Sequence, residues 1–195
     1  MNHVPERNMF PEPQYKVYVS YNHSIEDQEY RNHFEEILMA NQDVVIMKPA
    51  QIGNIDPNLD VETIRRKIRD EYLRDSAVTV VLIGSETWKR RHVDWEIRAS
   101  VRKTQDSPGS GLLGIILPTY PRNDITKYNQ YTIPPRLYDN IKCGFASIYD
   151  WDADPFIVQK WIHDAFERRN KLDPDNSRPS FVENLFGNAW HESGV

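Results

Sequence analysis

The stretch AVTVVLI, residues 77–83, decides the fold class of this chain, because every residue in it except Thr79 is apolar. A short and nearly continuous apolar run is typical of a central strand in a parallel sheet, where helices cover both faces. The polar turn Gly84-Ser85 follows, and a helix is expected from about Trp88 to Lys103. A buried strand, a turn and an amphipathic helix form the repeating unit of an α/β fold.

Further strands are predicted on both sides of this unit. β-Branched and aromatic runs favour extended structure, and such runs occur at residues 16–21, 43–47, 112–117 and 145–149. Together with residues 77–83, they predict a mostly parallel sheet of about five strands.

Amphipathic segments alternate with these strands. Apolar residues spaced three and four apart predict helices that begin after Ser24, after Asp60 and at Asp154-Pro155. Segments 48–58 and 118–142 contain prolines and are expected to be loops. The expected fold is therefore a flavodoxin-like, three-layer α/β fold.

The 195 residues are enough for one domain with tails. We place the domain at residues 15–171, after a polar tail at 1–14 and before a second tail at 172–195. The C-terminal tail is expected to dock on the domain, because it carries four large apolar side chains: Phe181, Leu185, Phe186 and Trp190.

Composition argues against several classes of protein. The formal net charge is −5 and the isoelectric point is near 5.7, whereas a general nucleic-acid binder is usually basic. No apolar run approaches the ~18 residues of a membrane span, and the segment from Met1 to Phe10 lacks the apolar core of a secretion signal. The single cysteine, Cys143, suits a reducing compartment. A cytoplasmic protein without nucleic-acid or membrane partners is expected.

Three patterns that resemble ligand sites have simpler explanations. Residues 109–114 match G-x-G-x-x-G, but they follow a helix and run into a strand, the reverse of a dinucleotide-binding loop. Asp150, Asp152 and Asp154 lack the glycine and glutamate of a calcium loop, so a strand end, a turn and a helix cap explain them better. The six histidines have no paired metal-ligand spacing, and no metal site is predicted.

The candidate site lies where the strands at 16–21 and 77–83 end. In doubly wound sheets, ligands bind outside the carboxyl ends of the strands, where the strand order reverses. This rule places residues 20–23 (SYNH) and residues 84–88 in candidate binding loops. The helix that follows begins at the same rim.

Glu96 is the candidate reactive group in the segment VVLIGSETWKRRHVDWEIRASV, residues 80–101. Val93, Ile97 and Val101 form the inward stripe of the expected helix, and Glu96 lies beside that stripe. Half-sheltered at the rim, its carboxylate is expected to have a raised pKa, as many functional groups do. The alternative is a boundary glutamate that pairs with a surface base such as Arg98.

Two segments, KVYVSYNHSIED (16–27) and SAVTVVLIGSETWKRRHVDWEIRAS (76–100), together resemble a known family. This is the TIR-like family that contains the signal-producing subunit of the Thoeris anti-phage defence system. The similarity spans about residues 16–161, and the second segment is its more specific part. The resemblance implies a TIR-type, flavodoxin-like fold, in agreement with the alternation of strands and helices.

The resemblance also implies an activity. Competent members of the family cleave NAD at the nicotinamide bond and often cyclise the ADP-ribose to a second messenger, which activates a partner effector. Glu96 falls on the catalytic glutamate of the family, and NAD is a substrate, with no metal or separate cofactor implied. A phage-derived trigger is expected, and a homo-oligomer stays open. The residues implied to bind NAD are Ser20, Tyr21, Asn22, Trp88, Arg91, His92 and Trp95.

His92 departs from the family pattern. Many TIR enzymes have a tryptophan four residues before the glutamate, where this chain has His92, so Trp88 or Trp95 would supply the aromatic wall instead. The departure favours an alternative, a TIR-type interaction module without turnover. A third class is a nucleoside-processing transferase of similar fold, with Glu96 as its nucleophile.

Overall fold

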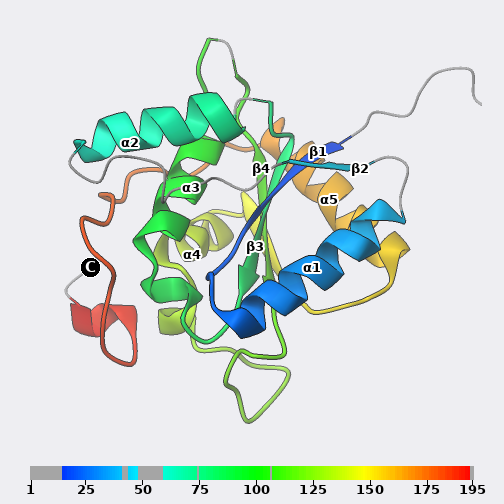
Figure 1. Ribbon diagram of the computed structural model, residues 1–195. Helices are drawn as coiled ribbons and strands as arrows, with labels where there is room; N and C mark the ends of the chain where they lie inside the picture. Colours follow the sequence, from blue (N-terminus) through cyan, green and yellow to red (C-terminus); the bar gives the residue numbers. More distant parts are fainter. Residues whose placement is uncertain (1–14, 41–43, 48–58, 74, 106, 194–195) are drawn as a thin grey trace, which may run out of the picture.

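A computed structural model describes residues 15–40, 44–47, 59–73, 75–105 and 107–193, without the side chains of Val61 and Arg65. Its centre is a five-stranded parallel sheet in the order β2-β1-β3-β4-β5 (Figure 1). The strands are β1 (Tyr15–Ser20), β2 (Val44–Ile46), β3 (Val78–Ile83), β4 (Gly111–Ile116) and β5 (Ala146–Asp150). This doubly wound architecture confirms the predicted fold class, and each strand bound differs from the prediction by at most one residue.

The central strand β3 is buried along its whole length, as its apolar sequence predicts. It pairs with β1 on one side, where Val17 lies opposite Val78, and with β4 on the other, where Val78 lies opposite Gly111. Its side chains alternate between two cores: Val80 and Leu82 belong to one, and Val81 and Ile83 to the other. A sheet buried on both faces requires this apolar composition.

Helices cover the two faces of the sheet, as Figure 1 shows. Helices α1 (Ile25–Met39) and α5 (Pro155–Arg169) pack against each other and share a core with β1 and β3. The other face carries α2 (Val61–Ile68), which continues into a π-helical turn (Arg69–Leu73), α3 (Arg91–Val101) and α4 (Pro135–Lys142). The fold therefore has three layers.

Side-chain caps fix three helix starts at the predicted places. The hydroxyl of Ser24 accepts a hydrogen bond from the backbone N–H of Asp27 at 3.2 Å. Asp60 accepts from the N–H of Thr63 at 2.9 Å, and Asp154 accepts from the N–H of Phe156 at 2.9 Å, with Pro155 in the first turn. Each cap satisfies an N–H group that has no partner within its own helix.

Two predictions about the helices are wrong in part. The segment 118–142 is not a loop throughout, because it ends in the eight-residue helix α4 after a 3-10 turn at Gln130–Thr132. The expected helix at 88–103 is divided: a 3-10 turn at Thr87–Lys89 precedes α3, and Arg90 between them is extended. The predicted loop at 48–58 and the tail at 1–14 lie outside the described residues.

The motifs that were set aside have structural roles. Gly111 stands in β4, where a Cβ atom would lie 2.3 Å from the carbonyl oxygen of Ala165, so this glycine allows α5 to pack closely on the sheet. Asp150 ends β5 and pairs with Arg122 at 2.7 Å. Asp152 accepts from the N–H of Asp154 at 2.8 Å in the turn that follows.

The C-terminal segment, residues 175–190, lies along α3 and α4. Backbone groups of this segment are hydrogen-bonded by Arg98, Asn140, Trp95 and Lys89. At the centre of the contact, the guanidinium of Arg136 donates to Asp94 at 2.8 Å, and the N–H of Phe181 donates to the same carboxylate at 3.0 Å. This segment is therefore part of the folded unit.

Candidate active site

The site lies at the carboxyl ends of β1 and β3. From β1 the chain continues to β2 on one side, and from β3 it continues to β4 on the other, so the direction of winding reverses between β1 and β3. Ser20 is the last residue of β1, and Gly84 follows the last residue of β3. Ligands of doubly wound sheets bind at this point, because the diverging connections leave a crevice there.

Glu96 projects from the middle of α3 onto the end of β1. Its side chain is 2% exposed, and both oxygens accept hydrogen bonds: Oε1 from the Tyr18 hydroxyl at 2.8 Å and Oε2 from the Ser20 hydroxyl at 2.5 Å. Tyr18 and Ser20 are two positions apart on β1, so their side chains share one face of the sheet. Glu96 is thus more deeply buried than its position beside the helix stripe predicts.

Burial raises the pKa of Glu96 to about 7, because the charged form has lost its water. The hydrogen bonds from Ser20 and Tyr18 and the nearby His23 act in the opposite direction, since they stabilise the carboxylate. A surface ion pair, the alternative role for this residue, is absent among the described residues, where Glu96 is hydrogen-bonded by two hydroxyl groups. The carboxyl group can therefore gain or lose a proton near neutral pH.

Two histidines stand near Glu96. The Nε2–H of His92 donates to the backbone carbonyl of Tyr21 at 3.1 Å, which leaves Nδ1 as an acceptor in the neutral ring. The rings of His92 and His23 are 4.8 Å apart between centroids. Burial lowers the pKa of both histidines, and the charge of His92 lowers that of His23 further. Burial thus favours the neutral form of both rings.

A second group of polar contacts joins the loops of the rim. The Nε–H of Arg90 donates to the side-chain oxygen of Asn22 at 2.9 Å, and the Thr119 hydroxyl donates to buried Asp27 at 2.9 Å. A Cβ atom on Gly84 would lie 2.2 Å from Asp27, so only glycine leaves room for this carboxyl group after β3. The loops after β1, β3 and β4 are thereby joined.

The predicted NAD-binding residues fall into two groups. Ser20 touches Glu96, while Asn22 and His92 lie on the same rim. The Tyr21 hydroxyl instead donates to Gln28 of α1, so its ring lies on the opposite face of β1 from the side chain of Ser20. At the rim, the backbone carbonyl of Tyr21 accepts from His92, and the Tyr21 ring lies 4.6 Å from the ring of His23 between centroids.

The remaining predicted residues are occupied by other contacts. The indole N–H of Trp95 donates to the carbonyl of Phe181 at 2.8 Å, and Arg91 lies 5.1 Å from the Trp95 ring and donates to the carbonyl of Val182 at 3.3 Å. Trp88 is buried in the 3-10 turn that precedes α3. Arg91 and Trp95 therefore face the C-terminal segment in this structure.

Tyr18 and Asp27 are site residues that the sequence prediction missed, whereas His23 was placed in a candidate binding loop without a role of its own. The position of Tyr18 was predictable, because a residue two positions before Ser20 in a strand lies on the same face of the sheet as Ser20. Asp27 lies in the first turn of α1, and its contact with Gly84 and Thr119 joins positions far apart in the sequence. No local pattern reports such contacts.

Two further observations concern metal ligands and membrane-spanning helices. Among the described residues, no group of three or more His, Cys, Asp and Glu side chains is arranged to hold a metal ion. Within the same part of the chain, no helix is both long and apolar enough to cross a membrane.

The fold and site together define a class. A parallel 2-1-3-4-5 sheet defines a flavodoxin-like, doubly wound fold, and a glutamate of the third helix is buried against the end of the first strand at its switch point. A comparison with protein families matches residues 18–122, more than half of the chain, to the TIR-like domain of the Thoeris protein ThsB. The chain belongs to this family, and its role is in Thoeris defence signalling with partners from that system. A search of curated proteins gave no significant match.

Proposed function

We propose that this chain cleaves NAD at the bond between nicotinamide and ribose, and that Glu96 is its catalytic carboxylate. The observation that supports the proposal most directly is the buried glutamate on two hydroxyl groups at the switch point of the sheet. Such a carboxyl group is costly to bury, so a functional role accounts for it better than a structural one. Membership of the ThsB TIR-like family adds independent support.

The proposed reaction needs one negative charge in the right place. When the C1′–N bond breaks, its electron pair leaves with nicotinamide, which departs neutral, and the ribose carbon becomes oxocarbenium-like. An ionised Glu96 stabilises this positive charge and accepts hydrogen bonds from the ribose hydroxyls. A hydroxyl or adenine nitrogen of the same molecule then attacks the carbon and loses a proton. The product is a cyclic ADP-ribose derivative that activates the partner effector.

Access to Glu96 requires movement. With 2% of its surface exposed, the carboxylate cannot touch a ribose in this conformation. We infer that the structure represents a resting state and that a phage-derived trigger favours a state in which Glu96 is accessible, by binding that state more tightly.

A TIR-type interaction module without turnover is the second candidate. His92 supports it, because its Nε2–H is bonded to the Tyr21 carbonyl and its ring stands beside His23, where many TIR enzymes have a tryptophan. In that case Glu96 would hold α3 on β1 and nothing more.

Mass spectrometry of nucleotides from infected cells tests the proposed function. Cells that carry the wild-type chain should lose NAD after infection and accumulate a nucleotide with the mass of ADP-ribose minus water. Cells with the Glu96→Gln variant, expressed at the same level, should keep their NAD. Unchanged nucleotide pools in protected wild-type cells would favour the interaction module.

The rate of cleavage should rise with pH. With a pKa of about 7, Glu96 is ionised to about a tenth at pH 6 and about nine tenths at pH 8. Because the ionised form is the active one, nicotinamide release by the triggered protein should rise with pH, and its midpoint should lie below pH 7, since exposure of Glu96 relieves the burial that raises its pKa in the resting state.

The Ser20→Ala variant provides a stricter version of this test. It removes a donor that stabilises the carboxylate, an interaction of about 1.5–3 kcal/mol, so the midpoint should move upward by about one pH unit or more. Ser85→Ala, in the turn after β3, is the matched control and should leave the midpoint in place. If the maximal rate of nicotinamide release falls but the midpoint of the pH curve stays in place, then Ser20 does not act through Glu96.

A further inference from the structure

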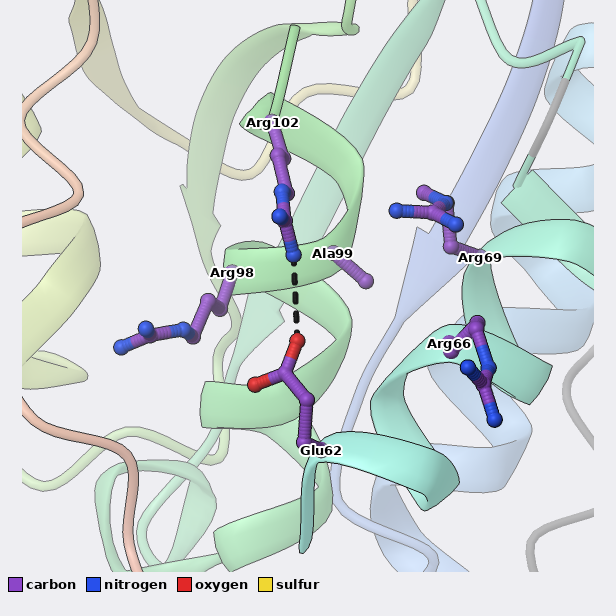
Figure 2. A pocket seen from close by; sticks show the side chains of 6 residues that line it. All are labelled: Glu62, Arg66, Arg69, Arg98, Ala99 and Arg102. Carbon is purple, nitrogen blue, oxygen red and sulfur yellow. Dashed lines mark hydrogen bonds and ion pairs between the residues drawn. The ribbon is translucent and has the colours of Figure 1, made fainter. Parts of the chain in front are cut away.

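A basic groove separates α2 and α3. Its lining comes from one face of α2 and its π-helical continuation, at positions spaced four and three apart, and from the facing turns of α3 (Figure 2). The lining residues are Glu62, Arg66, Arg69, Arg98, Ala99 and Arg102.

The charge of this groove is opposite to that of the chain. Four arginines and one glutamate line it, whereas the whole chain has a formal net charge of −5. Lysines elsewhere have carboxylates one helical turn away, as in the pairs Lys160–Asp164 and Lys171–Glu167. Glu62 and Asp70 lie one helical turn before and after Arg66 but pair with Arg102 and Arg69, and no ion pair of Arg66 occurs among the described residues. Like charges this close repel one another, so the groove has an excess of positive charge that an anion would neutralise.

The existing partners of these arginines are weak competitors for such an anion. Arg102 reaches across the groove to Glu62 at 3.1 Å, and both side chains are more than half exposed. Arg69 pairs with its neighbour Asp70, which is also half exposed. Exposed ion pairs of this kind contribute little, so a ligand with higher charge can replace them. Figure 2 shows the Arg69 guanidinium directed over Ala99 into the groove.

The residue types indicate the ligand. A guanidinium group presents parallel N–H donors that match phosphate oxygens. Ala99 is the one apolar residue among the described residues of the lining, and it leaves little for an apolar ligand to contact. Arg98 donates to the carbonyl of Arg178 and points away from the groove, so it contributes charge rather than contact.

We propose that the groove between α2 and α3 binds a phosphate-bearing small molecule through Arg66, Arg69 and Arg102, with Glu62 displaced from Arg102. The site is separate from the carboxylate at Glu96, although α3 carries parts of both: Ala99 lies three residues after Glu96, on the side of the helix that faces α2. The shared chemistry is a pyrophosphate group, which inorganic pyrophosphate and a nucleoside diphosphate both supply.

Calorimetric titration with pyrophosphate at constant ionic strength tests this proposal. Arg69→Gln combined with Arg102→Gln should weaken binding at least tenfold. Lys160→Gln combined with Lys171→Gln removes the same charge from exposed pairs around α5, on the other side of the sheet, and should bind like the wild type. Glu62→Gln removes the competing carboxylate and should bind pyrophosphate more tightly.

ADP and adenosine distinguish the sources of the phosphate. ADP that binds more tightly than pyrophosphate would identify a nucleotide ligand, equal binding would identify the pyrophosphate group alone, and adenosine should not bind. Equal affinity in the wild type and the Arg69/Arg102 variant would overturn the proposal. So would binding of an acidic peptide by the wild type without any binding of pyrophosphate. Circular dichroism spectra of all variants confirm that a lost signal is not due to unfolding.

Discussion

Glu96→Gln is expected to abolish nicotinamide release by the triggered protein. The amide keeps the size and shape of the side chain and can still accept a hydrogen bond from Tyr18 or Ser20, but it has no charge to stabilise the oxocarbenium-like ribose. Loss of such an interaction costs about 3–4 kcal/mol in the transition state, which corresponds to a rate that falls by a few hundred-fold. A coupled assay for free nicotinamide measures it.

Glu86→Gln is the matched control. Glu86 lies ten positions before Glu96 in the same segment, but its side chain is 41% exposed and pairs with Lys89 at 2.9 Å. An exposed pair of this kind contributes ~0–1 kcal/mol to stability, so this variant should keep the wild-type rate. Equal losses in both variants would point to a general effect of charge near α3 and not to catalysis by Glu96.

Arg136→Met is expected to cause the largest loss of stability. The pair of Arg136 and Asp94 is fully buried, and Arg136 also donates to Asn176 and to the carbonyl of Pro179. Methionine leaves the carboxylate of Asp94 buried, with a hydrogen bond from the N–H of Phe181 but no opposite charge beside it. An unpaired buried charge costs about 3–5 kcal/mol in the free energy of unfolding. Urea denaturation measures this loss, and protease cleavage between residues 175 and 190 should become faster.

Two further variants separate the effect of the Arg136–Asp94 ion pair from that of the hydrogen bonds between Arg136 and the C-terminal segment. Lys160→Met breaks an exposed pair with Asp164 and should change the free energy of unfolding by less than about 1 kcal/mol. Asp94→Leu combined with Arg136→Met removes both charges and should recover much of the lost stability. If the double variant is no more stable than Arg136→Met alone, then the hydrogen bonds from Arg136 to the C-terminal segment, and not the ion pair, hold the segment in place.

The sheet was predictable because its signals are local. Residues 78–83 are apolar at every position but Thr79, and Ser24 and Asp154 mark helix starts through contacts within three residues. Helix α4 was missed because it has only eight residues and begins after Pro134, inside a segment that its prolines mark as a loop. Short helices gain most of their stability from packing, which the amphipathic pattern reports weakly over two turns.

The candidate site was predictable only in part. Glu96 and Ser20 are near the strand ends that the topology brings together, and their contact agrees with that placement. The direction of the Tyr21 ring follows from the alternation of side chains along β1, which places it on the other face from Ser20. The contacts of Trp95 and Arg91 depend on residues 181 and 182, about 90 positions further along the chain, and no periodic pattern in one sequence predicts such pairs.

The number of nicotinamide molecules released per protein molecule tests the central claim most directly. Purified protein is incubated with NAD and an extract of phage-infected cells that lack the chain, and Glu96→Gln protein in the same extract provides the background. We expect the wild type to release many equivalents of nicotinamide above that background. One equivalent that then stops would indicate a trapped ribosyl-enzyme. The extract is prepared with a phage against which the wild-type chain protects cells. Equal release by both proteins in that extract would contradict the assignment of Glu96 as the catalytic carboxylate.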